Sequence, residues 1–287
     1  MAGLLDIIQA DPCLKEGELT PTQRTTLKNI MPAYDAAYLR EVCERRGHIL
    51  RTLIKNSVVK DDEATLYAIK GRQALHLSNH LSHFDYLQQL YTIRERGCDP
   101  PRIGGRSSVF IPSLEEAWKK CGAFKLPSHH MGAQDARIMM LLLRGIVASG
   151  QSILLYPEGG RSYDGKLKEF KTGGVGAIHR AAQDFDKDMV VVPHYLWYDV
   201  RVEDPAWPLL DACKRTVPFC YQVLDVSTFV SQYMAHSLVP AMNTSTVLHA
   251  VGKPFRILDC RNGKDVCERA HAAVEGLQQK HEPYTVK

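Results

Sequence analysis

Several features that define common protein classes are missing from this sequence of 287 residues. The longest apolar run, Ile138–Leu143, is far shorter than the ~20 residues that a helix needs to cross a bilayer. The first eleven residues lack the basic start and the long apolar stretch of a signal peptide. We therefore expect a cytoplasmic protein, bound peripherally to the inner face of a membrane if its substrate is a lipid.

The cysteines lack the spacing of a zinc site or a redox pair. The eight thiols stand at positions 13, 43, 98, 121, 213, 220, 260 and 267, and no two of them form Cys-x-x-Cys. Such scattered cysteines are typical of free thiols in a reducing compartment. A disulfide framework is the less favoured alternative.

The composition indicates neither disorder nor nucleic-acid binding. Hydrophobic residues make up 45% of the chain and charged residues 24%, which is ordinary for a globular protein. There are no internal repeats and no low-complexity tracts. The net charge of +4 is too small to indicate a nucleic-acid partner, but it suits an anionic substrate or a lipid surface.

The hydrophobic pattern changes near residue 60. Before that point apolar residues recur at helical spacing, as at Leu27, Ile30, Met31, Tyr34, Tyr38 and Val42. After it, short apolar stretches alternate with amphipathic ones, which is typical of an α/β sheet. We therefore expect a helical segment over residues 1–60, packed on an α/β domain over residues 61–287.

The predicted domain is a mixed β-sheet flanked by helices on both faces, with catalytic loops at one end of the sheet. Predicted strands are Ala64–Ile69, Ala74–Ser78, Ser152–Tyr156, Met189–Val192, Pro218–Val226 and Thr246–Val251. Predicted helices are Phe84–Arg96, Ser113–Gly122, Asp135–Ser149, Gly174–Asp184 and Lys264–Lys280.

A histidine and an aspartate follow the predicted strand Ala74–Ser78. The strand delivers Asn79 and His80 to its end, and Asp85 opens the next helix. A hydroxyl group that acts as a nucleophile needs a base to take its proton, and imidazole, with a pKa near ~6.5, suits that role. A carboxylate five residues on can fold back and hold the imidazole N–H. Alone, the pair is a weak signal, because a histidine at a strand end is often only structural.

The histidines at 76, 80 and 83 also raise the possibility of a metal site. No cysteine or carboxylate completes a known ligand spacing, and His76 lies inside a predicted strand. We expect no metal ion.

A second polar stretch, Pro157-Glu-Gly-Gly-Arg-Ser162, directly follows a predicted buried strand. Its glycines let backbone N–H groups approach a ligand closely. Arg161 can grip a phosphate with two parallel hydrogen bonds, and the lysines that follow add positive charge for an anionic substrate. A solvated charged loop is the alternative; it explains the lysines but not the run Pro-Glu-Gly-Gly-Arg after an apolar strand.

Together the two stretches resemble the glycerolipid acyltransferase family, which includes glycerol-3-phosphate and lysophosphatidic acid acyltransferases. The motif Asn79-His80-x4-Asp85 and the motif Pro157–Ser162 match that family in order, spacing and strand context. The resemblance extends over about Ala64 to Phe255. Val190–Pro193 is similar to the family's fourth block, an apolar strand that ends in proline and lines the acyl or acceptor site.

The resemblance implies that His80 and Asp85 form a catalytic dyad. It implies no cofactor, and a thioester of coenzyme A or of an acyl carrier protein as the donor. The expected substrate-binding residues are Asn79, Glu158, Gly159, Gly160, Arg161, Ser162, Lys125, Lys166, Lys171 and Pro193. Such a site requires His80 and Glu158 to be close neighbours.

One block departs from the family pattern. Members often carry an arginine that helps to bind the acceptor's phosphate, and Pro127 stands at that position here. Lys125 lies two residues before Pro127, so it can share a strand face with that position and supply the charge.

Three functional hypotheses follow. The leading one is O-acyl transfer to glycerol 3-phosphate or to its 1-acyl product in phospholipid synthesis at a membrane surface. The fragments Asn79–Tyr86 and Glu158–Ser162 favour glycerol 3-phosphate, whereas Phe170-Lys-Thr-Gly-Gly174 favours lysophosphatidic acid. The second hypothesis keeps the chemistry but uses a non-phosphorylated lyso-lipid, an amino-acid lipid or another lipid alcohol. The third is a non-catalytic lipid-binding protein, which the intact motifs disfavour.

Overall fold

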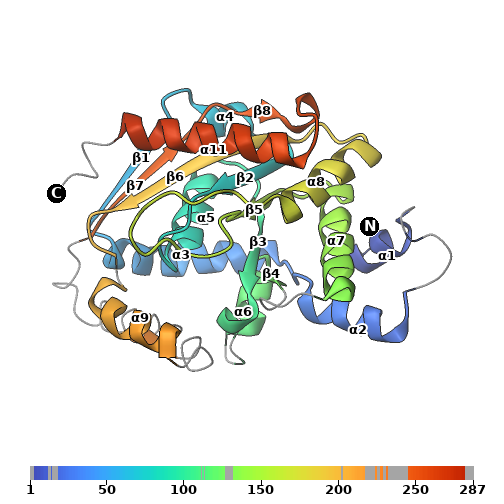
Figure 1. Ribbon diagram of the computed structural model, residues 1–287, viewed down its shortest axis with the longest axis horizontal. Coiled ribbons are helices and arrows are strands. Elements are labelled where there is room, and N and C mark those ends of the chain that lie inside the picture. Colours follow the sequence, from blue (N-terminus) through green and yellow to red (C-terminus); the bar gives the residue numbers. More distant parts are fainter. Residues whose placement is uncertain are drawn as a thin grey trace.

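A computed structural model of the protein describes residues 3–11, 14, 19–110, 112, 114–126, 132–201, 203–216, 224, 227–228, 231 and 245–281. Its centre is an eight-stranded sheet in the order β1-β7-β6-β2-β5-β3-β4, with β8 paired to β6 (Figure 1). The strands are β1 (Asn56–Lys60), β2 (Ala74–Ser78), β3 (Arg102–Arg106), β4 (Ala123–Leu126), β5 (Ile153–Leu155), β6 (Val190–Tyr198), β7 (Thr246–Val251) and β8 (Phe255–Arg256).

The strand directions bring several chain turns to one edge of the sheet. Strands β2, β3, β4, β5 and β6 are parallel to one another, whereas β7 and β8 run antiparallel to β6. The carboxyl ends of β2, β5 and β6 therefore lie side by side. Loops that leave such adjacent parallel strands commonly form the ligand site of an α/β sheet.

Helices cover both faces of the sheet (Figure 1). On one face, α7 (Ala133–Ala148), α8 (Thr172–Asp184) and α11 (Gly263–Lys280) share a core with Leu75 and Leu77 of β2. On the other, α4 (Thr65–Ala68) and α5 (Asp85–Glu95) pack against Ala74, Val190 and Val192. Alternate side chains of a strand point to opposite faces, so each strand contributes to both cores. The predicted mixed sheet with helices on both faces is confirmed.

The N-terminal helices pack on the helices and strands of the sheet domain. They are α1 (Leu4–Gln9), α2 (Pro21–Ile30) and α3 (Ala36–Leu53). Ile8 of α1 lies so close to Gly145 of α7 that a β-carbon there would come within 2.4 Å of it. The fully buried guanidinium of Arg144 bonds both oxygens of Asp11, at 2.7 and 2.9 Å. The division at residue 60 stays a prediction.

Two predicted stretches have a different secondary structure from the one expected. Ala64–Ile69 forms the short helix α4 rather than a strand, because the Asp61 carboxylate accepts hydrogen bonds from the amides of Thr65 and Leu66 and so caps a helical turn. Residues 56–60, assigned to the helical segment, form the edge strand β1.

Other differences are omissions. The sequence did not predict β3, whose two central glycines weaken the strand signal, or helix α9 (Trp207–Thr216). Short helix α6 (Glu115–Lys120) lies where a helix was expected. The strand predicted over Pro218–Val226 lies outside the described residues except for Leu224. None of the helices that the described residues form is long and apolar enough to cross a membrane.

Candidate active site

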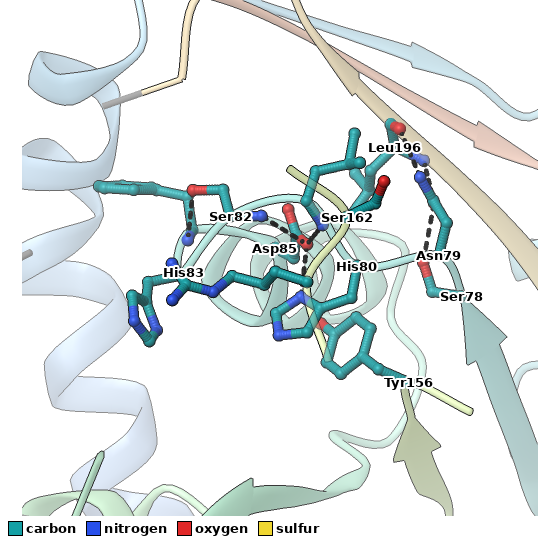
Figure 2. Close-up of polar contacts among 12 residues, drawn as sticks. Ser78, Asn79, His80, Ser82, His83, Asp85, Tyr156, Ser162 and Leu196 are labelled. Atoms are coloured by element: carbon teal, nitrogen blue, oxygen red, sulfur yellow. Dashed lines mark hydrogen bonds and ion pairs between the residues drawn. The ribbon is translucent and has the colours of Figure 1, made fainter. Parts of the chain in front are cut away.

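His80 and Asp85 meet at the carboxyl end of β2, where the chain turns into α5 (Figure 2). His80 Nδ1 lies 2.7 Å from Asp85 Oδ2. The same oxygen accepts the backbone N–H groups of Leu81, at 2.6 Å, and Ser82, at 3.0 Å. The turn therefore wraps around the Asp85 carboxylate, which fixes the contact predicted from the five-residue spacing.

The second oxygen of Asp85 accepts the hydroxyl of Tyr198, the last residue of β6, at 2.8 Å. Because the carboxylate is an acceptor in all these contacts, Nδ1 of His80 is the donor and Nε2 carries the lone pair. In the part of the chain that the structure describes, no group bonds to that Nε2. The His80 side chain is 17% exposed whereas Asp85 is fully buried, so the ring is accessible and its partner is not.

The His80 ring stacks on the ring of Tyr156, with centroids 4.3 Å apart and planes 22° from parallel (Figure 2). The Tyr156 hydroxyl is held by Gln89 Oε1 of α5, at 2.6 Å. Burial lowers the pKa of His80 below its usual value, and the opposing effect of Asp85 does not overcome it. His80 is therefore neutral near pH 7 and can accept a proton.

Replacing Tyr198 by phenylalanine should change the pH dependence of any reaction that uses His80 as a base. Without the hydroxyl the Asp85 carboxylate keeps more negative charge for the imidazole, so the pKa of His80 should rise and the acid limb of the kcat profile should move to higher pH. We expect kcat to fall by up to about tenfold, because a buried carboxylate oxygen loses its donor.

The measurement is the kcat–pH profile of Tyr198→Phe beside that of Tyr195→Phe. Tyr195 is also buried on β6 but belongs to the core on the opposite face, so its variant should keep the wild-type profile. A Tyr198→Phe profile that superimposes on the wild type would show that this hydroxyl does not tune His80.

The second motif leaves β5 and joins the first through its carboxylate. Glu158 Oε2 accepts the backbone N–H of His80, at 3.1 Å, and Oε1 accepts that of Lys168, also at 3.1 Å. The amide of Ser162 donates to the carbonyl of His80, at 2.7 Å. The predicted proximity of His80 and Glu158 is confirmed. Burial raises the pKa of Glu158 to about 7.

The absence of side chains at Gly159 and Gly160 leaves room for the cationic groups of Lys171 and Arg106. Gly159 has a φ of +74°, and a β-carbon there would lie 2.7 Å from Lys171 Nζ. A β-carbon on Gly160 would lie 2.7 Å from Nη2 of Arg106, which donates to the carbonyl of Gly159. A larger residue at either position would displace a positive charge from this loop.

The remaining residues of the motif lie around this loop. Arg161 is buried, with Nη1 3.5 Å from Oε1 of Glu203. The Ser162 hydroxyl donates to Asp164, at 2.9 Å. Lys166 lies 3.8 Å from the same carboxylate, but its side chain is 83% exposed. Of the predicted binding residues, Glu158 and Ser162 thus contact the backbone of His80, and Lys171 lies beside Gly159 of the same loop.

Three predicted binding residues make contacts within the fold, and their role in binding a substrate stays a prediction. The Asn79 amide donates to the carbonyl of Leu196 and accepts its N–H, at 2.9 and 2.8 Å, which ties β6 to the loop after β2. Lys125 forms a 2.7 Å ion pair with Glu115. Pro193 was expected to end its strand, but β6 continues to Tyr198, and the proline carbonyl accepts the N–H of Gly252. Pro127 lies outside the described residues.

Pro193 is tolerated inside β6 because of where it stands. On that side of the strand, β8 pairs with Val190–Val191 and β7 pairs with His194–Tyr198, so the proline occupies the break between them. It lies on the face of Tyr195, opposite that of Tyr198, and Gly252 packs against it.

The sequence reasoning missed four residues of this site: Arg106, Tyr156, Tyr198 and Glu203. The first three stand at or directly after the ends of β3, β5 and β6. The carboxyl ends of parallel strands lie at one edge of the sheet. Once the strands are known, the positions of these three residues at strand ends therefore indicate that they belong to the site. Glu203 lies in the turn beyond β6, and no sequence pattern marks it.

Comparison with known proteins places this site in a family. The family model described as "Acyltransferase" matches residues 56–197. A glycerol-3-phosphate acyltransferase of Xanthomonas campestris pv. campestris is 26% identical over 215 residues, which is 70% of this chain and 24% of that protein. One of Pseudoalteromonas atlantica is 30% identical over 176 residues, which is 58% of this chain and 22% of that protein. The chain thus spans less than a quarter of either relative's length.

A solved structure shares the fold. The crystal structure of the 1-acyl-sn-glycerophosphate (LPA) acyltransferase PlsC from Thermotoga maritima superimposes with a TM-score of 0.51. The match covers 84% of this chain and 79% of that one, at 15% sequence identity. The region matched by the family model contains the dyad, Tyr156 and the 158–162 loop. Residues 56–197 of this chain therefore form the domain that the family model describes as "Acyltransferase".

Proposed function

We propose that this protein moves a fatty acyl group from a thioester to a hydroxyl of glycerol 3-phosphate or of its 1-acyl product. The observation that carries the proposal is a neutral, accessible His80, held by Asp85 beside a loop that carries cations. The relatives named glycerol-3-phosphate acyltransferases support this class of acceptor.

The proposed reaction is direct transfer with His80 as general base. His80 Nε2 takes the proton of the acceptor hydroxyl while the hydroxyl oxygen attacks the thioester carbonyl. Asp85 stabilises the imidazolium that forms. The C–S bond of the tetrahedral intermediate then breaks, and the departing thiolate takes the proton from Nε2 of His80. The products are an ester and a free thiol, and the protein is unchanged.

No serine is needed as the nucleophile. The Ser82 hydroxyl donates to Glu203, at 2.8 and 3.0 Å from its two oxygens, and the Ser162 hydroxyl donates to Asp164. Both hydroxyls are thus directed to carboxylates rather than to the imidazole. This supports attack by the acceptor itself and argues against an acyl-enzyme on either serine.

The cations of the loop support a phosphate-bearing acceptor. Arg106 and Lys171 lie at the glycines, and Arg161 follows them. Guanidinium groups match phosphate oxygens in pairs, and ammonium groups add point charge. Arg106 also stands opposite Leu126 in the β3–β4 register, next to the position of Pro127. We infer that Arg106, rather than Lys125, compensates for the family arginine that is missing there.

The remaining parts of the proposal concern the donor and the location. The donor is a thioester of coenzyme A or of an acyl carrier protein, and no cofactor takes part. The acylated product is a membrane lipid or its precursor, so the protein works at the inner surface of a membrane in phospholipid synthesis. The lysines that follow the second motif would attract the protein to anionic lipids.

The proposal is tested by thiol release from a long-chain acyl-CoA with a panel of acceptors. The panel holds glycerol 3-phosphate, lysophosphatidic acid and monoacylglycerol, with mass spectrometry of the lipid product. We expect release that depends on one of the two phosphorylated acceptors. Release with monoacylglycerol alone would replace the proposed acceptor with a non-phosphorylated one. If no acceptor causes thiol release, from acyl-CoA or from an acyl carrier protein donor, the non-catalytic lipid-binding protein becomes the favoured hypothesis.

A further inference from the structure

The turn that follows β6 contacts both motifs. Tyr198 donates to Asp85 of the first motif. Arg201 donates to the carbonyls of Ser162 and Tyr163 in the second, at 2.9 and 2.8 Å. Glu203 reaches both motifs at once. This turn therefore fixes the two loops relative to each other, although neither motif includes it.

Glu203 is a fully buried carboxylate with an unusual set of partners. Its Oε1 accepts the backbone N–H of His83, at 2.7 Å, and both oxygens accept from the Ser82 hydroxyl. These contacts attach it to the loop that carries His80. From the second motif, Nη1 of Arg161 lies 3.5 Å from the same Oε1.

The cost of burying these groups indicates what Glu203 does. A buried carboxylate costs several kcal/mol unless donors surround it, and a buried guanidinium is costly unless a negative charge is near. Arg161 is 7% exposed and Glu203 is 0% exposed, so each supplies the charge that the other needs. At 3.5 Å between Nη1 of Arg161 and Oε1 of Glu203, the contact is an ion pair with loose geometry.

We propose that Glu203 is a positioning residue for the acceptor. It holds the Arg161 guanidinium beside the His80 loop, in the orientation that binds the acceptor's phosphate, so that the acceptor hydroxyl is brought to His80 Nε2. This inference rests on the proposed function for the identity of the acceptor. Glu203 itself touches neither the reacting atoms nor the phosphate.

The test is the affinity for glycerol 3-phosphate in Glu203→Gln, measured by calorimetry without donor and as KM in the thiol-release assay. The glutamine keeps the size and one acceptor oxygen for His83 but removes the charge opposite Arg161. We expect Kd and KM for glycerol 3-phosphate to rise about tenfold, with kcat changed by less than about threefold. The KM for the acyl donor should not change.

Matched variants separate this role from a general effect on folding. Asp199→Asn removes a carboxylate from the same turn whose partners are the amides of Val200 and Thr246, and it should keep the wild-type Kd. Glu203→Asp retains the charge and should lie between the wild type and Glu203→Gln. It also serves as the test if the glutamine variant does not fold. In an Arg161→Gln background, Glu203→Gln should weaken binding no further.

An unchanged Kd in Glu203→Gln, or a fall in kcat with Kd and KM unchanged, would overturn the inference. Wild-type protein that binds no glycerol 3-phosphate would overturn it too. Wild-type protein that binds glycerol 3-phosphate but does not acylate it would contradict the proposed function alone. In that case a higher Kd for glycerol 3-phosphate in Glu203→Gln would still support the positioning role of Glu203.

Discussion

Replacing His80 by alanine is expected to lower kcat for acyl transfer by about 10³-fold, with little change in the KM of either substrate. The imidazole is the group placed to take the hydroxyl proton, since its Nδ1 is bonded to Asp85 and its side chain is 17% exposed. Without it, only solvent can accept that proton. The residual rate would come from substrate binding in the right orientation.

The measurement is acceptor-dependent thiol release by His80→Ala beside His271→Ala. His271 lies on α11, where its ring contacts Phe170 edge to face. Its variant controls for the loss of a histidine elsewhere in the fold and should retain wild-type kcat. A His80→Ala protein that is folded and keeps more than about a tenth of the wild-type kcat would exclude His80 as the base.

The protein is expected to lose stability as the pH falls below about 6.5, because three buried histidines must stay neutral in the folded state. His76, His194 and His249 lie on adjacent strands β2, β6 and β7, on the face covered by α5. Their rings form a hydrogen-bonded string, with 2.8 Å from His76 to His194 and 2.9 Å from His194 to His249. Nδ1 of His249 is buried, and no group in the described part of the chain bonds to it.

Burial lowers the pKa of His76 and of His249 to about 3, and it lowers that of His194 well below its usual value. Unfolded histidine binds a proton below about pH 6.5, so the unfolded state binds more protons between pH 6.5 and 3. Stability is therefore complete above pH 6.5 and is lost as the pH falls toward the folded-state values. At pH 5 the loss is about 2 kcal/mol for each of His76 and His249.

Glu158 acts in the opposite direction over part of this range. Its folded-state pKa of about 7 is above the unfolded value, so the folded state binds the extra proton and gains stability as the pH falls. The histidine contribution is therefore isolated by comparing variants rather than from the wild type alone.

Urea unfolding of the wild type and of His249→Gln at pH 7.5 and pH 5 gives that comparison. The glutamine cannot bind a proton. The free energy of unfolding should therefore fall by about 2 kcal/mol less between pH 7.5 and pH 5 in the variant than in the wild type. His271→Ala, a change at a partly exposed histidine outside the string, should behave as the wild type does. If the unfolding free energies of His249→Gln and the wild type depend equally on pH, the buried His249 does not contribute to the loss of stability at low pH.

Much of the fold could be predicted because the informative signals are local. Ala74–Ser78 and Thr246–Val251 were predicted with the observed bounds, since each is a short, mostly apolar stretch. The helices after the second motif and at the end of the chain were also found within a few residues. Ala64–Ile69 failed because the Asp61 cap, which lies outside the apolar run, decides its conformation.

The site could be predicted only as far as its motifs extend. His80, Asp85 and Glu158 belong to two compact patterns, and their mutual contacts follow from the turn and from adjacent strands. Arg106 and Glu203 come from other parts of the chain, and only the sheet order brings them to the loop. Conversely, Asn79 fits the motif, yet its amide bonds the backbone of Leu196 across the β2–β6 pair. Such long-range contacts leave no local pattern.

The most direct test of acyl transfer with His80 as base is a single-turnover experiment with enzyme in excess over a long-chain acyl-CoA. Thiol release and the intact mass of the protein are followed with and without glycerol 3-phosphate. Direct transfer predicts no burst of thiol and no gain of an acyl group by the protein until the acceptor is added, then one ester for each thiol. A burst without acceptor, matched by an acylated protein, would contradict it, as would thiol release that never depends on an acceptor.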